Sequence, residues 1–284
     1  MRFSPSLLSL RSLRLPLFLL GALLLAAAIA CEEKLEDNGG ETPPASEVTP
    51  TATEPPGIQL SPQPPVSDPS GNVLPHPGFE DCPAPDSTPC GEWFALKPPD
   101  FTVTSNQAHS GDKSAYLMMR QPAEAEGVAI NYLVQEVNPS EFPEVLSGFY
   151  RVDNWKRGTE KQYLQFVVIV WGAENAPTDP NDMPYGNHQI RYILTGIDSD
   201  PFSIANAQFV YVHGKEPVEG EWVPFEVNVK QDFEDLWGAV PTGYERIRLL
   251  YEVRYDDKVV GDPAEADVYY DDLYFGPAQG SPTE

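Results

Sequence analysis

The chain has 284 residues, 18 Lys and Arg against 43 Asp and Glu, and a formal net charge of −25 at pH 7. Such an excess of acid argues against binding to the phosphates of nucleic acids and against electrostatic docking on anionic lipid. The first 30 residues contain three arginines and no acid, so the chain without them is more acidic still.

The N-terminus predicts export. Three arginines precede the apolar run 15–30, which is shorter than the roughly 20 residues of a membrane span. A basic flank, an apolar stretch and small residues before a break are typical of a secretory signal. The run ends in "AIAC", which resembles a bacterial lipobox, where cleavage precedes the cysteine and lipid joins its sulfur. We expect residues 1–30 to be a lipoprotein signal peptide and Cys31 to anchor the protein to the bacterial cell membrane or cell surface.

An ordinary signal peptide and an uncleaved anchor are the alternatives for this segment. The cysteine count favours the lipoprotein, because an odd number in an exported protein calls for an explanation. If Cys31 carries lipid, Cys82 and Cys90 remain to form a disulfide in an oxidising compartment. A metal site at these two cysteines is the weaker alternative, since no histidine pair lies near them.

A proline-rich linker follows the lipidated cysteine. Residues 32–71 contain no aromatic side chain and are rich in Pro, Glu, Thr, Ser and Gly. Such a segment cannot bury enough apolar surface to fold, so we expect a disordered tether over 31–71. The folded domain is expected over 72–277, and 278–284 form a C-terminal tail.

The folded part predicts an all-β domain. Short aromatic and β-branched runs recur between clusters of Gly, Pro, Asn and Asp, which is typical of antiparallel strands. In the run 246–255, apolar residues alternate with Arg246, Arg248, Glu252 and Arg254, as in a half-buried strand. The expected strands are 114–120, 127–137, 146–152, 162–171, 189–195, 208–213, 222–229, 246–255 and 267–275.

One short helix is expected at 230–238, where Phe233, Leu236 and Trp237 share a side and Gly238 ends the pattern. The segments 153–160 and 172–188 read as long loops. About nine strands over roughly 200 residues suit one jelly-roll β-sandwich. Trp93, Trp222 and Trp237 are assigned to its core.

Four motifs resemble a known family. They are "NVLPHPGFEDC" at 72–82, "EWFAL" at 92–96, "NQAHSGDKSAYL" at 106–117 and "VYYDDLYFG" at 268–276. In this order they resemble the galactose-binding-like jelly roll of carbohydrate-binding modules. The motifs bracket the whole domain, whereas the middle of the chain matches no pattern of that family.

The resemblance implies a structural calcium where the first and last strands meet. Its ligands would be the Glu80 side chain, backbone carbonyls from Ser110 to Lys113, and Asp271. Calcium takes six to eight oxygens from carboxylates and carbonyls, which agrees with this set. Alternation along the last strand favours Asp271 over Asp272 as the inward carboxylate, although a β-bulge would reverse the parity. The alternative is that Asp271 only accepts backbone hydrogen bonds.

No motif of a hydrolase, metalloprotease, phosphate loop or dinucleotide site occurs, so we expect no enzyme. Sugars stack on flat aromatic side chains, and exposed aromatic residues are therefore the candidate ligand-binding residues. Core packing is the alternative for those that lie on strands. The candidates are Trp155, Trp171, Tyr185, Tyr192 and Tyr211.

Two functions fit these observations. The first is a non-catalytic, glycan-binding lipoprotein displayed on the cell surface, with a structural calcium. The second is a surface interaction or scaffold protein of the same fold, with an envelope protein as partner and no sugar site. Convergence of the candidate aromatic residues on one exposed face would favour the first.

Overall fold

In the computed structural model, the described residues all belong to one compact unit, which lies within 48–284. Cys31, the predicted signal peptide and linker, Tyr185 and most of the predicted tail lie outside the described residues. No helix within the described part is both long and apolar enough to cross a membrane. The described residues are 71–82, 90–96, 101–122, 124, 126–176, 187–197, 199–258, 260–261 and 263–278.

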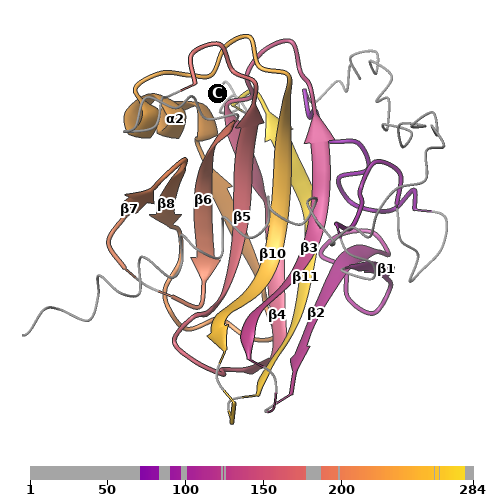
Figure 1. Ribbon diagram of the computed structural model, residues 1–284. Helices are drawn as coiled ribbons and strands as arrows, with labels where there is room; N and C mark the ends of the chain where they lie inside the picture. Colours follow the sequence, from indigo (N-terminus) through magenta and orange to yellow (C-terminus); the bar gives the residue numbers. More distant parts are fainter. Residues whose placement is uncertain are drawn as a thin grey trace, which may run out of the picture. The chain divides into compact units, whose positions relative to one another are not determined.

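Two antiparallel-rich sheets pack face to face, with the six-stranded sheet in front in Figure 1. The five-stranded sheet has the order β1-β2-β11-β4-β9, and the six-stranded sheet has the order β3-β10-β5-β6-β8-β7. The strands are β1 (Thr102–Thr104), β2 (Ser114–Gln121), β3 (Gly127–Val137), β4 (Val145–Lys156), β5 (Gln162–Trp171), β6 (Asn187–Thr195), β7 (Phe202–Ile204), β8 (Ala207–Tyr211), β9 (Trp222–Val227), β10 (Arg246–Lys258) and β11 (Ala264–Gly276).

The core lies between the sheets and is built by alternation. Successive residues of a strand point to opposite faces, so every second residue can enter one core. On β10 the inward set is fully buried, as the sequence predicts: Ile247, Leu249, Tyr251, Val253 and Tyr255. On β11 the inward set includes Val268 and Tyr270. The all-β jelly-roll sandwich is thereby confirmed.

All nine predicted strands are present, with ends that shift by a few residues. The sequence missed β1 and β7, which have three residues each and carry too few side chains to show a period. It also placed 153–160 in a loop, whereas β4 continues to Lys156 and contains Trp155. Asn154 has a positive φ of 52°, and this local twist hides the strand pattern at that end.

The predicted helix is α2 (Val229–Trp237). The side chain of Asn228 accepts a hydrogen bond from the backbone N–H of Gln231 and caps the first turn. Gly238 ends the helix in the left-handed conformation, with φ 81°. Phe233 is fully buried and joins the core of the sandwich.

The first described segment lies against the last strand. The N–H of Val73 donates to the carbonyl of Phe275 at 2.8 Å, and the side chain of Asn72 bonds to Leu273 and Phe275. The predicted disulfide between Cys82 and Cys90 is confirmed, with their Cα atoms 5.2 Å apart. These contacts bring Glu80 to the end of the sandwich where β11 bends.

Candidate functional site

The two adjacent aspartates of β11 lie at a β-bulge. The register with β4 shifts between Asp271 and Tyr274, and Asp272 has a positive φ of 49°. Inward residues therefore change from Val268 and Tyr270 to Leu273 and Phe275. Asp271 is the fully buried carboxylate, but it shares the outer face with Tyr269, so the alternation argument for it was wrong.

Backbone N–H groups hold Asp271 under the turn at 109–113. Its Oδ2 accepts hydrogen bonds from the N–H groups of His109 at 2.7 Å and Ser110 at 3.2 Å. Burial raises the pKa of the Asp271 carboxyl to about 6, because the loss of water outweighs these hydrogen bonds. None of the ion pairs among the described residues includes Asp271, so the described part of the chain offers this buried carboxylate no cationic partner.

Glu80 meets the same turn from the other side. Its Oε1 accepts hydrogen bonds from the N–H groups of Asp112 and Lys113, each at 2.9 Å. The Lys113 ammonium bonds to the carbonyls of Glu80 and Cys82 at 2.8 and 2.9 Å. A Cβ on Gly111 would lie 2.4 Å from the Glu80 carboxylate, so this close approach requires glycine.

The residues predicted to hold calcium thus lie around one turn. Glu80 and Asp271 supply two carboxylates, which suit calcium, and the N–H groups of Ser110 and Lys113 donate hydrogen bonds to them. Within the described part of the chain, no three His, Cys, Asp or Glu side chains form a group that could hold a metal. The two carboxylates suit the ion, and the backbone carbonyls of the turn stay a prediction.

The four candidate aromatic residues that the structure describes do not gather at one point. Tyr192 is fully buried in the core, where its hydroxyl donates to Asp232 at 2.8 Å, so its prediction as a ligand-binding residue is corrected. Trp155 is half-buried against the core beneath Arg157. Trp171 and Tyr211 both lie on the outer face of the six-stranded sheet, but near opposite ends of the sheet, since Trp171 pairs with Asn187 of β6 and Tyr211 with Ile193.

That outer face carries polar side chains that the sequence did not single out. Strand pairing places them in neighbouring rows across β10, β5, β6 and β8. No described helix packs against it. We call this set the six-strand face, and all its members are at most 4% exposed: Tyr163, Gln165, Gln189, Arg191, Phe209, Glu252, Arg254 and Asp256.

An ion-pair row runs along β10 in this face. The Nε atom of Arg254 donates to both oxygens of Asp256 at 2.9 and 3.1 Å, and its Nη1 lies 3.4 Å from Glu252. Tyr163 donates its hydroxyl hydrogen to Asp256 at 2.8 Å, and Gln165 donates to Glu252. Burial raises the pKa of Tyr163 well above its ordinary value, so its hydroxyl stays a donor.

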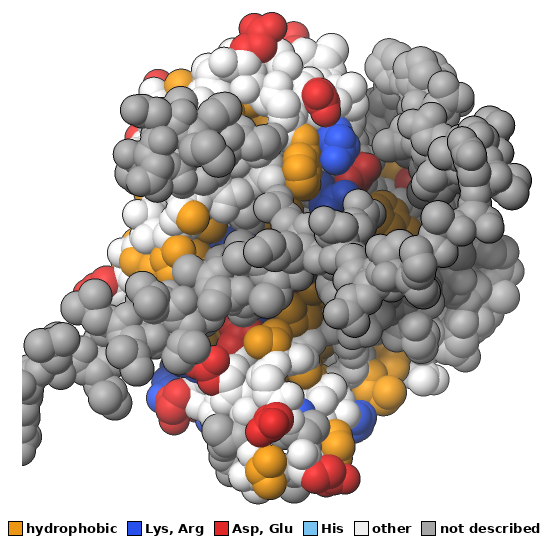
Figure 2. Space-filling model, viewed as in Figure 1, with side chains coloured by type: hydrophobic (Ala, Val, Ile, Leu, Met, Phe, Trp, Pro, Cys, Tyr) orange, Lys and Arg blue, Asp and Glu red, His pale blue; other side chains and the backbone are white. Residues whose placement is uncertain are grey.

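The far end of the same sheet face is also charged. Trp171 lies beneath two arginines, with its ring centroid 4.8 Å from the guanidinium of Arg246 and 5.6 Å from that of Arg248. Both arginines bond to Glu136. On the surface turned to the viewer in Figure 2, Lys or Arg side chains lie beside hydrophobic and acidic ones.

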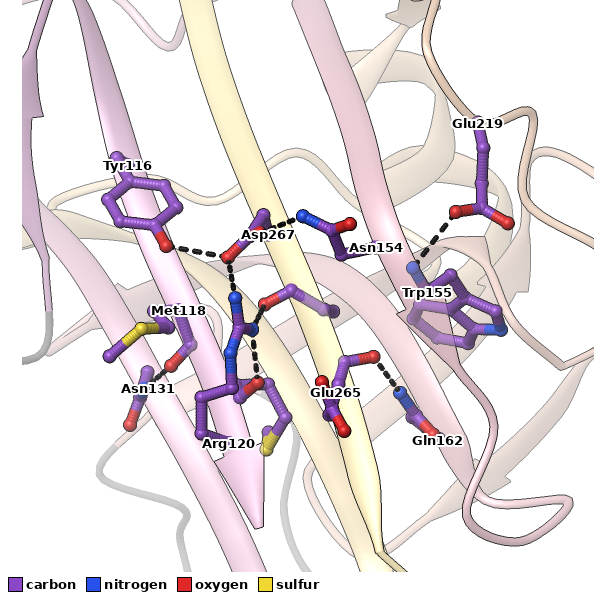
Figure 3. A network of polar contacts seen from close by, with 12 residues as sticks. Tyr116, Met118, Arg120, Asn131, Asn154, Trp155, Gln162, Glu219, Glu265 and Asp267 are labelled. Atoms are coloured by element: carbon purple, nitrogen blue, oxygen red, sulfur yellow. Dashed lines mark hydrogen bonds and ion pairs between the residues drawn. The ribbon is translucent and has the colours of Figure 1, made fainter. Parts of the chain in front are cut away.

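The outer face of the five-stranded sheet has a different polar cluster, centred on Asp267 (Figure 3). The carboxylate accepts hydrogen bonds at 2.6 Å from Tyr116 and Asn154, and it pairs with Arg120. Burial alone would raise the pKa of Asp267, but these three partners lower it below the ordinary value. The cluster satisfies its own groups and ties β2, β4 and β11 together.

The sequence contained a signal for the six-strand face, namely polar residues within central strands, but these were interpreted as the exposed side of half-buried strands. Glu252 and Arg254 alternate with the core residues of β10 and were assigned to a half-buried strand, whereas both are 1% exposed. Gln165 stands between Leu164 and Phe166 in β5, and Arg191 stands between Ile190 and Tyr192 in β6. Polar residues at alternate positions of three central strands, aligned by register, were the available clue.

No family model matches the sequence, and no curated protein matches it. Similar solved structures include the carbohydrate-binding module TmCBM61 in complex with β-1,4-galactotriose. The two sequences are 12% identical, the match covers 72% of this chain and 97% of that chain, and the TM-score is 0.37. The C-terminal family 22 carbohydrate-binding module of Clostridium thermocellum Xyn10B has 13% identity, covering 74% and 96%, with a TM-score of 0.37.

The K3 cleaved adhesin domain of Lys-gingipain from Porphyromonas gingivalis is also similar, at 15% identity, covering 73% and 99%, with a TM-score of 0.36. At these TM-scores the likenesses carry no argument about what this chain binds. The β-sandwich fold rests on the two sheets themselves.

Proposed function

We propose that the protein is a non-catalytic, glycan-binding protein. The observation that carries the proposal is the combination on one sheet face of amides, paired charges and aromatic rings. Gln165, Gln189 and Arg191 lie in neighbouring rows, with Phe209 beside Arg191. Glycan sites need this mixture, because hydroxyl groups bond to planar polar groups while sugar rings stack on aromatic faces.

The charges of this face support binding rather than hydrolysis. A glycosidase needs two carboxylates that flank the scissile bond in separate roles. Glu252 and Asp256 instead lie on either side of Arg254 and both bond to its guanidinium. Buried ion pairs contribute little net stability to a folded protein. Stability alone therefore gives only a weak explanation for the ion pairs along β10.

A panel of polysaccharides, neutral and acidic, tests the proposal on the purified full-length protein. We expect binding to at least one glycan, and loss of that binding in the double variant Gln165→Ala, Gln189→Ala. The matched control is Arg151→Ala, on the outer face of the five-stranded sheet, which should bind as the wild type does. Absence of binding to every glycan would favour the interaction or scaffold protein instead.

Display on the cell surface is part of the proposal and rests on the sequence. The resemblance of "AIAC" to a lipobox supports lipid attachment at Cys31, and the net charge of −25 disfavours other attachment to anionic membranes. The proline-rich segment 32–71 would hold the binding domain away from the lipid.

A structural calcium is also proposed, at Glu80 and Asp271. Its support is the buried Asp271 carboxylate without a cationic partner among the described residues, together with a second carboxylate at the same turn. A divalent ion would offset the free-energy cost of that buried charge. The N–H donors of the turn are the competing means of holding both side chains.

A further inference from the structure

A pocket lies where β4, the edge strand β9 and the bulge of β11 meet. Its volume is about 550 Å³, within the range of roughly 300–1,000 Å³ that is typical of small-molecule sites. Strand pairing sets two residues of β4 beside two of β9, since Ser147 pairs with Glu226 and Phe149 pairs with Pro224. All four line the pocket, and Asp272 of the bulge lines it as well.

The side chains around this pocket are accessible. Pro224 and Glu226 are exposed at its rim. Ser147, Phe149 and Asp272 are half-buried, so each keeps part of its surface in contact with solvent. A ligand can therefore contact these side chains directly from solution.

The ring of Phe149 forms an aromatic wall that is held in place. His109 stacks on this ring, with the centroids 3.5 Å apart and the planes 14° from parallel. The Nδ1 atom of His109 lies 2.6 Å from the carboxylate of Asp272, which fixes the imidazole in turn. His109 does not line the pocket, so the ring surface of Phe149 that borders the pocket is a part that His109 leaves open. The C–H groups of a sugar pack on such a surface, and a ring that is already fixed lowers the entropy cost of binding.

The polar groups of the pocket favour a cation. Glu226 and Asp272 supply two carboxylates, and no Lys or Arg occurs among the described residues that line the pocket. The carboxylate of Asp272 is held by the side chains at 109 and 110, and these two bonds use about half of the roughly four acceptor sites of a carboxylate. His213 also lines the pocket, and burial lowers its pKa, so its imidazole adds a hydrogen-bonding group without adding positive charge.

We infer that this pocket binds an amino sugar whose amino group is unacetylated and therefore cationic. The sugar ring packs on Phe149, and its ammonium group bonds to Glu226 and Asp272. A neutral sugar would cover the ring and leave both carboxylates without a cation, whereas a ringless ammonium would leave the aromatic wall uncovered. The formal net charge of −25 also favours a cationic ligand over an acidic one. The pocket is separate from the six-strand face, so this inference goes beyond the proposed function and does not depend on it.

Two trisaccharides that differ only in the amino group test the inference: the β-1,4-linked trimer of glucosamine and its N-acetylated form. Calorimetric titration of the full-length protein measures both affinities, in a buffer that keeps the free amino groups protonated. We expect the glucosamine trimer to bind about tenfold more tightly than the acetylated one, as two charge-assisted contacts imply. Glu226→Gln should weaken the glucosamine trimer about fivefold, the upper range for an exposed ion pair, and leave the acetylated trimer unchanged. Phe149→Leu should weaken both, because both trimers carry the sugar ring.

Glu221→Gln is the matched control. Glu221 is exposed and directly precedes β9, but it does not line the pocket. Its replacement removes the same charge from the same edge of the sheet, so this variant should bind both trimers as the wild type does. Trilysine is the second control, because it carries ammonium groups without a sugar ring.

Equal affinity for the two trimers would overturn the inference, and so would the absence of binding to either. Equal losses in Glu226→Gln and Glu221→Gln would overturn it as well, because the attraction would then come from the overall negative charge. Trilysine that binds as tightly as the glucosamine trimer, with the same loss in Glu226→Gln, would assign the pocket to basic protein segments instead. Each of these outcomes leaves the proposed function standing, since Gln165 and Gln189 do not line the pocket.

Discussion

Single side chains on the six-strand face bury charge in two energetically different ways. Arg254 is bonded to two carboxylates, so removal of its guanidinium leaves Glu252 and Asp256 without that cation. Arg191 has no such anion among the described residues, so its removal relieves the desolvation free energy of a buried, unpaired charge. The same substitution at the two positions should therefore change the stability of the protein in opposite directions.

We predict that Arg254→Met lowers the free energy of unfolding by about 3–5 kcal/mol, the usual cost of breaking a buried ion pair from one side. Urea denaturation followed by tryptophan fluorescence measures the change. Arg191→Met, on the neighbouring strand β6, is the control and should unfold at the wild-type midpoint or above it. Equal midpoints for wild type and Arg254→Met would show that the β10 row is solvated.

At the scale of the elements, α2 is attached to the six-stranded sheet through an aromatic contact. His188 of β6 meets the edges of Phe233 and Trp237, at centroid distances of 5.3 and 5.7 Å. Burial lowers the pKa of His188 to about 4. The packing of the helix thus depends on a histidine that stays neutral.

This contact predicts a loss of stability in acid. Between pH 6.5 and 4 the unfolded chain binds a proton at His188 and the folded chain does not, so the free energy of unfolding falls as pH falls. The full effect is about 3 kcal/mol. In His188→Phe this contribution is absent, so its unfolding curve should fall less steeply from pH 7 to pH 4. Parallel curves would contradict the assignment.

Strand periodicity explains which elements the sequence could predict. Long alternating strands such as β3 and β10 were found with correct or nearly correct bounds, because core packing sets their period. β1 and β7 are held by pairing with a neighbour and leave no pattern of their own. The site was harder, since Arg191, Gln165 and Arg254 lie far apart in sequence and only register across three strands brings them together.

At the scale of the whole molecule, the proposed lipid at Cys31 is the feature that would determine where the domain is displayed. We predict that Cys31→Ser moves the protein from the membrane fraction to the soluble fraction, because an acidic chain has no electrostatic attraction to anionic lipid. Labelled palmitate should enter the wild type and not the variant. Equal labelling of the two proteins would refute lipid attachment at this residue.

The junction of the first described segment with β11 closes the sandwich, and it is where calcium is proposed. At a hundredfold excess over its dissociation constant, an ion bound only by the folded state adds about 2.7 kcal/mol of stability. The melting temperature should therefore rise by several degrees with calcium and fall again with EDTA. Asp271→Asn should abolish this response, because the amide keeps the shape and loses the charge.

Asp272→Asn is the matched control for that experiment. Asp272 is half-buried, and its carboxylate bonds to the side chains of His109 and Ser110 at 2.6 and 2.7 Å. Its loss should lower the melting temperature slightly and leave the calcium response intact. If EDTA does not change the melting temperature of the wild type while Asp271→Asn still lowers it, backbone N–H groups hold the buried carboxylate, those of His109, Ser110 and Asp272, and no ion is required at the bulge.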